Sequence, residues 1–575
     1  YGMDVWLWYP NVGRDYHDFG CIDREMEERR RVFSAISYLD AMLVPLGDPG
    51  SLWPTDAMRL TEHFVEILHE YHPEAGLWVA PQHFQPEPGW YDTFYEEIAK
   101  EPDWICGVCF APWEQDSIEE LYEKLPEKYR ENIRNYPDIS HNSNCQFPVE
   151  NWDMAFALTS GREGYNARPE KMKAIHNMLE PYTIGSITYS EGIHDDVNKI
   201  LWTDQDFDSS VAAEETMADY ANLFIDSETS EQVAEFLMDV EHNWDGPVLE
   251  NDGIDALYES FTAFDKTVSK QVKNNYRYQM LKLRILTDYW TKQKYAKDQE
   301  LEQQARAVLD LADITGSEAV IREARTILNL SRDVPAAEDV LFEMLKLADS
   351  LRNLCGIQLT ENHHGGQCWI RGAYLQTRSM PLNDYQYLMQ SFKRIEKMQN
   401  EKNRCAALHQ LNLRQDPGDG NQFCAPGTYE GFSHVSVWHS WEEDPGYLKT
   451  PFIDHSVYTM VGLLHEIDGW YHEFPMPLTW ALNVTVLYGT PLEMTFTGLD
   501  PEASYGMKVF YPNSFFRAFV GQTALKDETL VNIRAGKVLL ADRIAQNPNG
   551  KSVRREIEAG REPFWEYDLP KESYQ

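Results

Sequence analysis

The fold of this chain is decided by a unit that is clearest at residues 56–82, DAMRLTEHFVEILHEYHPEAGLWVAPQ. In its first part, 56–71, apolar side chains recur at spacings of three and four residues, which predicts an amphipathic helix. The run GLWVAPQ (76–82) follows after a short polar link and is continuously apolar, as a strand buried on both faces is. A helix joined in this way to a buried strand predicts a parallel sheet made of β/α units.

The same unit recurs from residue 1 to about 225. The expected strands are 4–10, 41–47, 76–82, 105–113, 132–140, 154–160 and 183–190. Alternating strands and helices fit either a doubly wound open sheet or a (β/α)8 barrel. No Gly-rich phosphate loop follows any of these strands, which favours a TIM-like barrel over residues 1–225. Seven strands are one too few, so we expect the first strand to lie upstream of Tyr1 or one strand to be unrecognised.

The rest of the chain changes character twice. Residues 226–415 hold long amphipathic stretches with few Gly or Pro residues and predict an α-helical domain. Residues 416–489 are rich in Trp, His, Gly and Pro, which indicates a loop-rich connection. Residues 490–575 alternate apolar and polar side chains and turn at Asp500-Pro501, so we expect a C-terminal β-sandwich.

Charge and composition limit the partners. Lys and Arg number 51 against 93 Asp and Glu in 575 residues, a net charge of -42. Such a surface repels nucleic-acid phosphates and anionic lipids, so we expect neither nucleic acid nor a membrane as partner. The eight cysteines are dispersed and indicate no disulfide framework. A periplasmic or extracellular location is slightly favoured over the cytoplasm, and the Trp-rich loops near 432–480 could bury a second copy of the chain.

Polar side chains gather in three places that each follow an expected strand. These clusters are YPDISHNSNCQFP (136–148), TSGREGYNARP (159–169) and TYSEGIHDDVNK (188–199). In a barrel they would converge at the carboxyl ends of the strands, where active sites of barrels are assembled. Carboxylates that arrive from separate strands are what cleavage of a glycosidic bond requires.

We therefore assign roles for a two-carboxylate mechanism. Glu191 is the expected general acid, and Asp138 or Glu163 the expected base or nucleophile. The side chains expected to bind or orient the sugar are His141, Gln146, Arg162, Arg168, Tyr189, Asp195, Asp196, Asn198, Asp48, Gln82, His363 and His364.

Simpler roles exist for several of these residues. Asp195 and Asp196 could begin a helix, where acids suit the positive end of the dipole. Asp138 could cap a turn, and Arg162 with Glu163 could form a structural ion pair.

The segment NHHGGQCW (362–369) offers two histidines and a cysteine. Adjacent histidines do not point the same way on a regular element, and no zinc motif surrounds them. We expect no metal and no cofactor.

The clusters are similar to sequences of one group of bacterial proteins from polysaccharide-degrading organisms. The resemblance is carried by YPDISHNSNCQFPVENWDMAFALTSGRE (136–163), NARP (166–169), ITYSEGIHDDVNK (187–199), RGAYLQTRSMPLND (371–384) and TFTGLDPEASYGMKVFY (495–511). That group resembles the barrel superfamily of α-glucuronidases, β-hexosaminidases and O-GlcNAcases. The resemblance implies a glycoside hydrolase with a barrel followed by a helical domain.

The chain departs from the hexosaminidase pattern, because it shows no Asp-Glu or paired-Asp motif of that type. Arg162 and Arg168 would suit an acidic sugar, since arginine binds carboxylates in pairs of hydrogen bonds. We expect an exo-acting glycosidase for a glycan with a uronic or sialic acid. Two alternatives stay open: a carbohydrate-binding protein whose 17 Trp and 31 Tyr stack on sugars, and a metal-dependent hydrolase or isomerase built on His141, His363 and His364.

Overall fold

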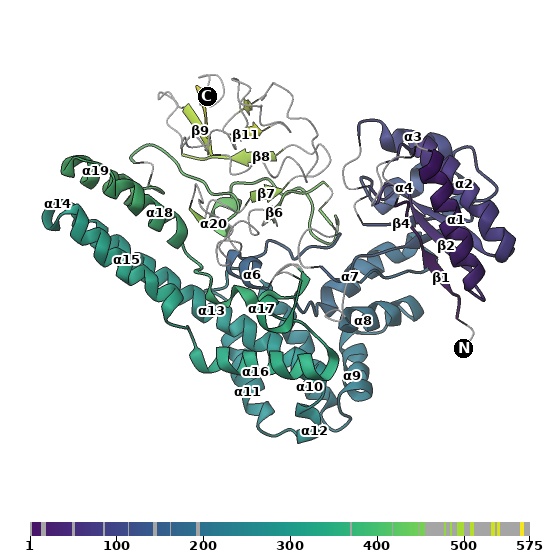
Figure 1. The fold of residues 1–575 in the computed structure, drawn as a ribbon, viewed down its shortest axis with the longest axis horizontal. Helices are drawn as coiled ribbons and strands as arrows, with labels where there is room; N and C mark the ends of the chain where they lie inside the picture. The colour runs from purple at the N-terminus through teal and green to yellow at the C-terminus, as the bar shows by residue number, and fades with distance from the viewer. Residues whose placement is uncertain are drawn as a thin grey trace.

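Figure 1 presents the chain as a computed structural model, in which a β/α region, a large helical region and a C-terminal region are distinct. The structure describes residues 3–12, 16, 19–48, 52–83, 87–112, 114–141, 146–160, 163–190, 196–367, 371–416, 418–444, 446–447, 449–454, 477–478, 483–485 and 492–498, and the backbone of strands at 506–510, 531–534, 537–540 and 564–568.

Five parallel strands form one sheet near the N-terminus. They lie side by side in chain order: β1 (Trp6–Trp8), β2 (Ala41–Pro45), β3 (Gly76–Ala80), β4 (Gly107–Phe110) and β5 (Ile133–Asn135). Crossovers between parallel strands are right-handed, so an unbroken strand order places the connecting helices on one face. Figure 1 shows α1 (Phe19–Ala35), α2 (Pro54–Tyr71) and α3 (Trp90–Ile98) together on that side.

The two faces of the sheet carry alternate residues of each strand. Met42 and Val44 pack under the helices with Phe64, in the main apolar core. Leu43 and Trp78 point the other way, into a separate cluster that also contains Tyr136. This second face leads to the carboxyl edge of the sheet, where the candidate site lies.

The barrel expected over residues 1–225 is wrong. Beyond β5, the described chain adds to the sheet only through isolated parallel bridges, from Asn135 to Ser186 and from Asp138 to Tyr189. The expected strand 154–160 is instead helix α6 (Met154–Thr159). Asp153 caps it, because Asp153 Oδ1 accepts the Ala155 N–H at 2.8 Å. All of α6 is buried, so its apolar run carries no helical periodicity that would distinguish it from a strand.

Besides α1–α3, two helices precede β5, and helices make up most of the described chain after it. In order they are α4 (Ile118–Lys124), α5 (Glu127–Arg130), α7 (Pro169–Leu179), α8 (Asp196–Phe207), α9 (Ala213–Phe224), α10 (Ser230–Asp239), α11 (Gly253–Asp265), α12 (Lys270–Lys273), α13 (Tyr276–Leu309), α14 (Ala312–Thr315), α15 (Ser317–Asp333), α16 (Glu338–Cys355), α17 (Glu361–His364), α18 (Tyr385–Glu396) and α19 (Glu401–Asn412). The region 226–415 is thus helical, but helices begin well before it. The end of α13 packs with α15, α18 and α19 around a second core, which forms the arm seen in Figure 1.

The β-sandwich expected over residues 490–575 is also wrong. There β8 (Leu492–Thr495), β10 (Val531–Arg534) and β11 (Lys537–Leu540) form a three-stranded antiparallel sheet, while β9 (Gly506–Phe510) pairs with β12 (Phe564–Asp568). The region 416–489 holds α20 (Tyr429–Phe432) and the pair β6 (Phe452–Asp454) and β7 (Asn483–Thr485); most of the Trp-rich stretch near 432–480 lies outside the described residues. Alternation and turns predict strands, but not how many of them pair.

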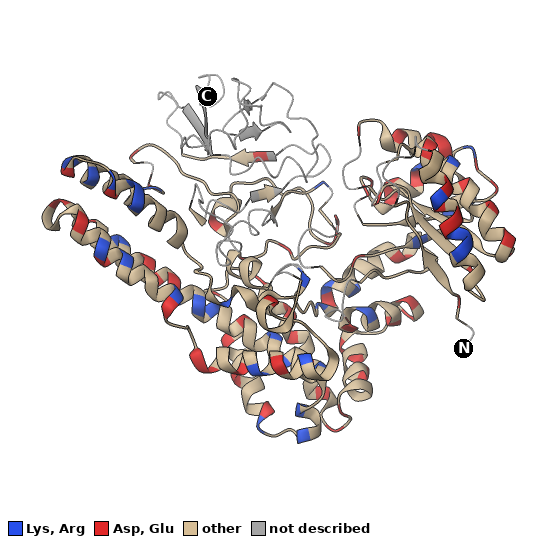
Figure 2. Ribbon diagram, in the orientation of Figure 1, with Lys and Arg blue, Asp and Glu red and all other residues tan. Residues whose placement is uncertain are grey.

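Among the described helices, none is long and apolar enough to cross a membrane. Figure 2 shows acidic and basic residues interspersed along these helices. Over the whole sequence the acidic residues are in excess, with a net charge of -42.

Candidate functional site

The loop that follows β5 places Asp138 and His141 at the carboxyl edge of the sheet. Both side chains are only 2% exposed, and His141 Nδ1 lies 2.5 Å from Asp138 Oδ2. The other Asp138 oxygen accepts the N–H and the hydroxyl of Ser140, each at 3.2 Å. Gln146 Oε1 accepts the backbone N–H of Asp138 at 3.2 Å, so Gln146 shapes the same loop. Asp138 therefore fixes the direction of the His141 ring.

The opposite nitrogen of His141 faces a second carboxylate. His141 Nε2 lies 3.5 Å from Glu163 Oε1. Arg371 Nη1 donates to the same oxygen at 2.5 Å, across 208 residues of sequence. The Glu163 side chain is 10% exposed and the Arg371 side chain is 35% exposed. Glu163 and Arg371 therefore lie nearer to solvent than Asp138. We call Asp138, His141, Glu163 and Arg371 the carboxylate–histidine line.

Two asparagines hold the loop that carries His141. Asn166 Nδ2 donates to the His141 carbonyl at 3.2 Å. Asn198 Nδ2 donates to the Ile139 carbonyl at 3.2 Å, and Asn198 Oδ1 accepts the Arg168 N–H at 3.0 Å. Asn198, expected to contact the sugar, thus joins the loop after β5 to α7 and α8.

Two further residues expected to contact the sugar are engaged with the protein itself. The buried guanidinium of Arg168 donates to the carbonyls of Phe147 at 2.7 Å and of Pro148 at 3.2 Å. Asp196 is the first residue of α8. Its carboxylate accepts from Arg277 Nε at 2.6 Å and from the Tyr220 hydroxyl at 3.0 Å.

Asp48 and Gln82 lie at neighbouring strand ends of the same edge. Gln82 Nε2 donates to Asp48 Oδ2 at 3.0 Å. Burial raises the Tyr136 pKa, and the charges of Asp48 and Asp138 raise it further. Tyr189 stands beside this group, with its ring centroid 5.9 Å from those of Tyr136 and His141.

Asp48 gives the site a pH dependence that Asp48→Asn should reveal. Burial raises the pKa of Asp48 from 3.8 to about 6, so ionisation destabilises the native state as the pH rises through this interval. Asp48→Asn is expected to raise the free energy of unfolding by about 1–2 kcal/mol at pH 7.5. This is less than the full cost of ionising the buried carboxylate, because the hydrogen bond from Gln82 offsets part of that cost. The gain should be much smaller at about pH 4 and should vanish well below the usual pKa of 3.8, where Asp48 is protonated in both states.

Calorimetric unfolding of both proteins at pH 4 and 7.5 measures this difference. The matched control is Asp56→Asn on α2, whose side chain is 44% exposed and should show no such gain. An equal effect of Asp48→Asn at both pH values would contradict the assignment.

Two residues near this edge, Glu114 and Arg371, are not among the predicted site residues. Glu114 follows β4; it is buried, and its Oε1 accepts the Ala111 N–H at 2.6 Å. Burial raises the pKa of Glu114 well above its usual value, which favours the protonated acid. Its position after a strand was a usable signal. No sequence signal linked Arg371 to Glu163.

Three predicted site residues, Arg162, Glu191 and Asp195, lie outside the described residues. His363 and His364 are described and contact Asp349 of α16, whereas His141 contacts Asp138 and Glu163. The described contacts therefore assign His141 and the other two histidines to different carboxylates.

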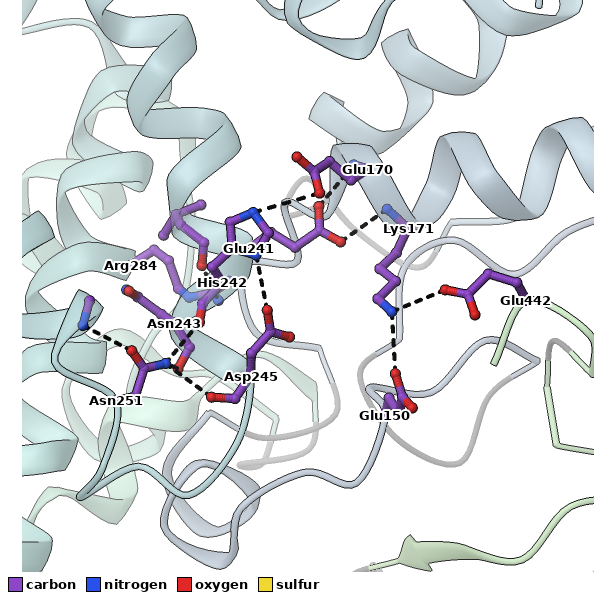
Figure 3. A network of polar contacts seen from close by, with 12 residues as sticks. Glu150, Glu170, Lys171, Glu241, His242, Asn243, Asp245, Asn251, Arg284 and Glu442 are labelled. Carbon is purple, nitrogen blue, oxygen red and sulfur yellow. Dashed lines mark hydrogen bonds and ion pairs between the residues drawn. The ribbon is translucent and has the colours of Figure 1, made fainter. Parts of the chain in front are cut away.

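A polar network joins the start of α7 to the helical region after α10 (Figure 3). Glu241 accepts the N–H groups of Glu170 at 2.9 Å and Lys171 at 3.0 Å, at the positive end of α7. Burial raises the pKa of Glu241 to about 7. Arg284 of α13 donates to the Tyr165 carbonyl at 2.7 Å. Tyr165 lies between Glu163 and Asn166 in the sequence. The long helix α13 thus supports the segment that carries Glu163.

Neither a search against protein-family models nor one against curated proteins found a match for this chain.

Proposed function

We propose that this chain is a glycoside hydrolase that removes an acidic sugar from the end of a glycan, with Glu163 as its reactive carboxylate. The observation that carries the proposal is the double contact of Glu163, with His141 Nε2 at 3.5 Å and Arg371 Nη1 at 2.5 Å, at the carboxyl edge of a parallel sheet. A carboxylate that accepts from a guanidinium suits a base or a nucleophile rather than a proton donor.

The position of His141 gives Asp138 and Glu163 different roles. Its imidazole stands between Asp138 and Glu163, so these carboxylates cannot flank the same glycosidic bond. Asp138 is therefore a positioning residue that aims His141, while Glu163 faces the sugar. The second carboxyl of the mechanism is proposed to be Glu191, which follows Tyr189 by two residues in the sequence.

An acidic sugar is proposed as the substrate class. Arg162 in the sequence supports it, and so does the resemblance to a bacterial group that is itself similar to a superfamily including α-glucuronidases. Arg168 does not, because its guanidinium is used on the carbonyls of Phe147 and Pro148.

Substrates with different leaving groups distinguish the proposed role of Glu191 as acid from that of Glu163 as base or nucleophile. In Glu191→Gln, hydrolysis of natural oligosaccharides is expected to fall about 10²- to 10⁴-fold, because the departing oxygen no longer receives a proton. Hydrolysis of dinitrophenyl glucuronides or sialosides should fall far less, since that leaving group departs without a proton. Glu163→Gln should lose both activities.

The screen uses aryl glycosides and oligosaccharides with wild type and both variants, and counts the sugar released. Equal losses on both substrate types in Glu191→Gln would remove Glu191 as the acid. Sugar binding without release by wild type would favour the carbohydrate-binding alternative and contradict the proposal.

A further inference from the structure

Two adjacent histidines converge on one carboxylate oxygen at the surface of the helical region. His363 Nε2 lies 3.0 Å and His364 Nε2 3.1 Å from Asp349 Oδ1. The histidines end the single-turn helix α17, and Asp349 lies on α16. The sequence-based expectation that adjacent histidines diverge fails here, because both long side chains bend toward the same neighbouring helix. The ring centroids are 4.7 Å apart.

One of the two imidazoles is held in its orientation by the protein. The His364 ring is buried, and its Nδ1 lies 3.0 Å from Thr360 Oγ1, which leaves Nε2 directed at Asp349. Gln358 Nε2 donates to the carbonyls of His364 and Gly365, each at 3.0 Å, and so fixes the backbone. A partner on the second ring nitrogen is the usual outer-shell support of a metal-binding histidine. The His363 side chain is 73% exposed, so an ion can enter from solvent.

The donor set and its spacing suit a zinc-like ion. Two imidazole nitrogens and one carboxylate oxygen lie within 4.8 Å of one another. Around tetrahedral zinc, with bonds of about 2.0–2.2 Å, neighbouring ligand atoms are about 3.3–3.6 Å apart. The contacts of 3.0 and 3.1 Å therefore need to open by only a few tenths of an ångström. Mixed imidazole and carboxylate ligands favour zinc and its first-row neighbours over Mg²⁺ or Ca²⁺.

We propose that Asp349, His363 and His364 bind a divalent transition-metal ion of the zinc class, with the fourth position open to water. The ion cross-links α17 to α16. This site is independent of the carboxylate–histidine line and of the glycosidase proposal, since it shares no ligand with either.

The test titrates Zn²⁺ and Co²⁺ into the full chain, purified without a histidine tag, stripped with a chelator and desalted. Wild type is expected to bind one ion with micromolar or tighter affinity, to show the visible bands of tetrahedral Co²⁺, and to unfold at a higher temperature with Zn²⁺. His363→Ala and Asp349→Ala should each weaken binding at least about 100-fold. Thr360→Val should weaken it about 10- to 100-fold through the lost support of His364.

The matched control is His409→Ala on α19. His409 Nε2 lies 2.9 Å from Asp313 Oδ2, so it is another exposed His–Asp pair. Binding that is unchanged in this control but lost in the other variants supports the site. Equal binding by wild type and the Asp349 and His363 variants, or no tight binding by wild type, overturns it. His363 is exposed, so its replacement should leave the metal-free unfolding temperature unchanged and the comparison valid.

Discussion

Glu163→Gln is expected to lower the kcat/KM for sugar release by about 10³-fold or more while leaving the protein folded. The amide keeps the size of the side chain but cannot act as a base or form the glycosyl intermediate. The contacts of Glu163 with Arg371 and His141 are both made at Oε1. Steady-state hydrolysis of the best substrate from the screen measures the loss.

The matched control for Glu163→Gln is Glu150→Gln. Glu150 accepts from Lys171 at 3.2 Å, and its side chain is 44% exposed. Its replacement should leave kcat/KM within about two-fold, as an exposed ion pair contributes little. Activity of Glu163→Gln within about ten-fold of wild type would remove Glu163 from the chemistry.

Arg284→Ala is expected to reduce the free energy of unfolding by about 3–5 kcal/mol, the largest stability effect foreseen here. Arg284 Nε donates to Asp288 Oδ2 at 2.7 Å, and both side chains are buried in α13. Asn243 and Trp244 also donate to Asp288, at 2.9 and 3.2 Å, so the carboxylate is held by three groups. Removing the guanidinium leaves a buried negative charge with its main counter-ion gone.

Calorimetry and urea unfolding test this loss against Arg325→Ala. Arg325 makes two hydrogen bonds to Glu396, at 3.0 and 3.1 Å, on the exposed arm. That pair should be worth less than about 1 kcal/mol. Similar losses in both variants would show that the buried pair is not the stronger one. A double variant, Arg284→Met with Asp288→Leu, removes both charges. If it restores the free energy of unfolding, the loss in Arg284→Ala comes from the unpaired charge of Asp288.

The sequence predicts the individual elements better than their assembly. The runs 41–47 and 76–82 contain β2 and β3, since apolar β-branched and aromatic runs between polar links define buried strands. Closure of the sheet was not predictable, because it depends on how many strands pair. The one apolar run that became a helix, 154–160, is buried all round and has no period to reveal it.

The sequence also predicts part of the candidate site. Asp138 and Glu163 follow strand-like runs, and the structure brings both to His141. Arg371 could not be placed there, because its contact with Glu163 spans 208 residues. The sequence pattern predicts Arg168 and Asn198 as sugar ligands, but their partners are backbone groups whose positions depend on the fold.

We propose that a glycan is cleaved at the carboxylate–histidine line. The most direct measurement is a crystal structure of the Glu163→Gln variant soaked with the oligosaccharide that wild type hydrolyses. We predict the terminal sugar at the carboxyl edge of the sheet, with its anomeric carbon either within about 3.5 Å of the substituted side chain or joined to it through one water. A sugar bound away from His141 and from the substituted position would contradict the account.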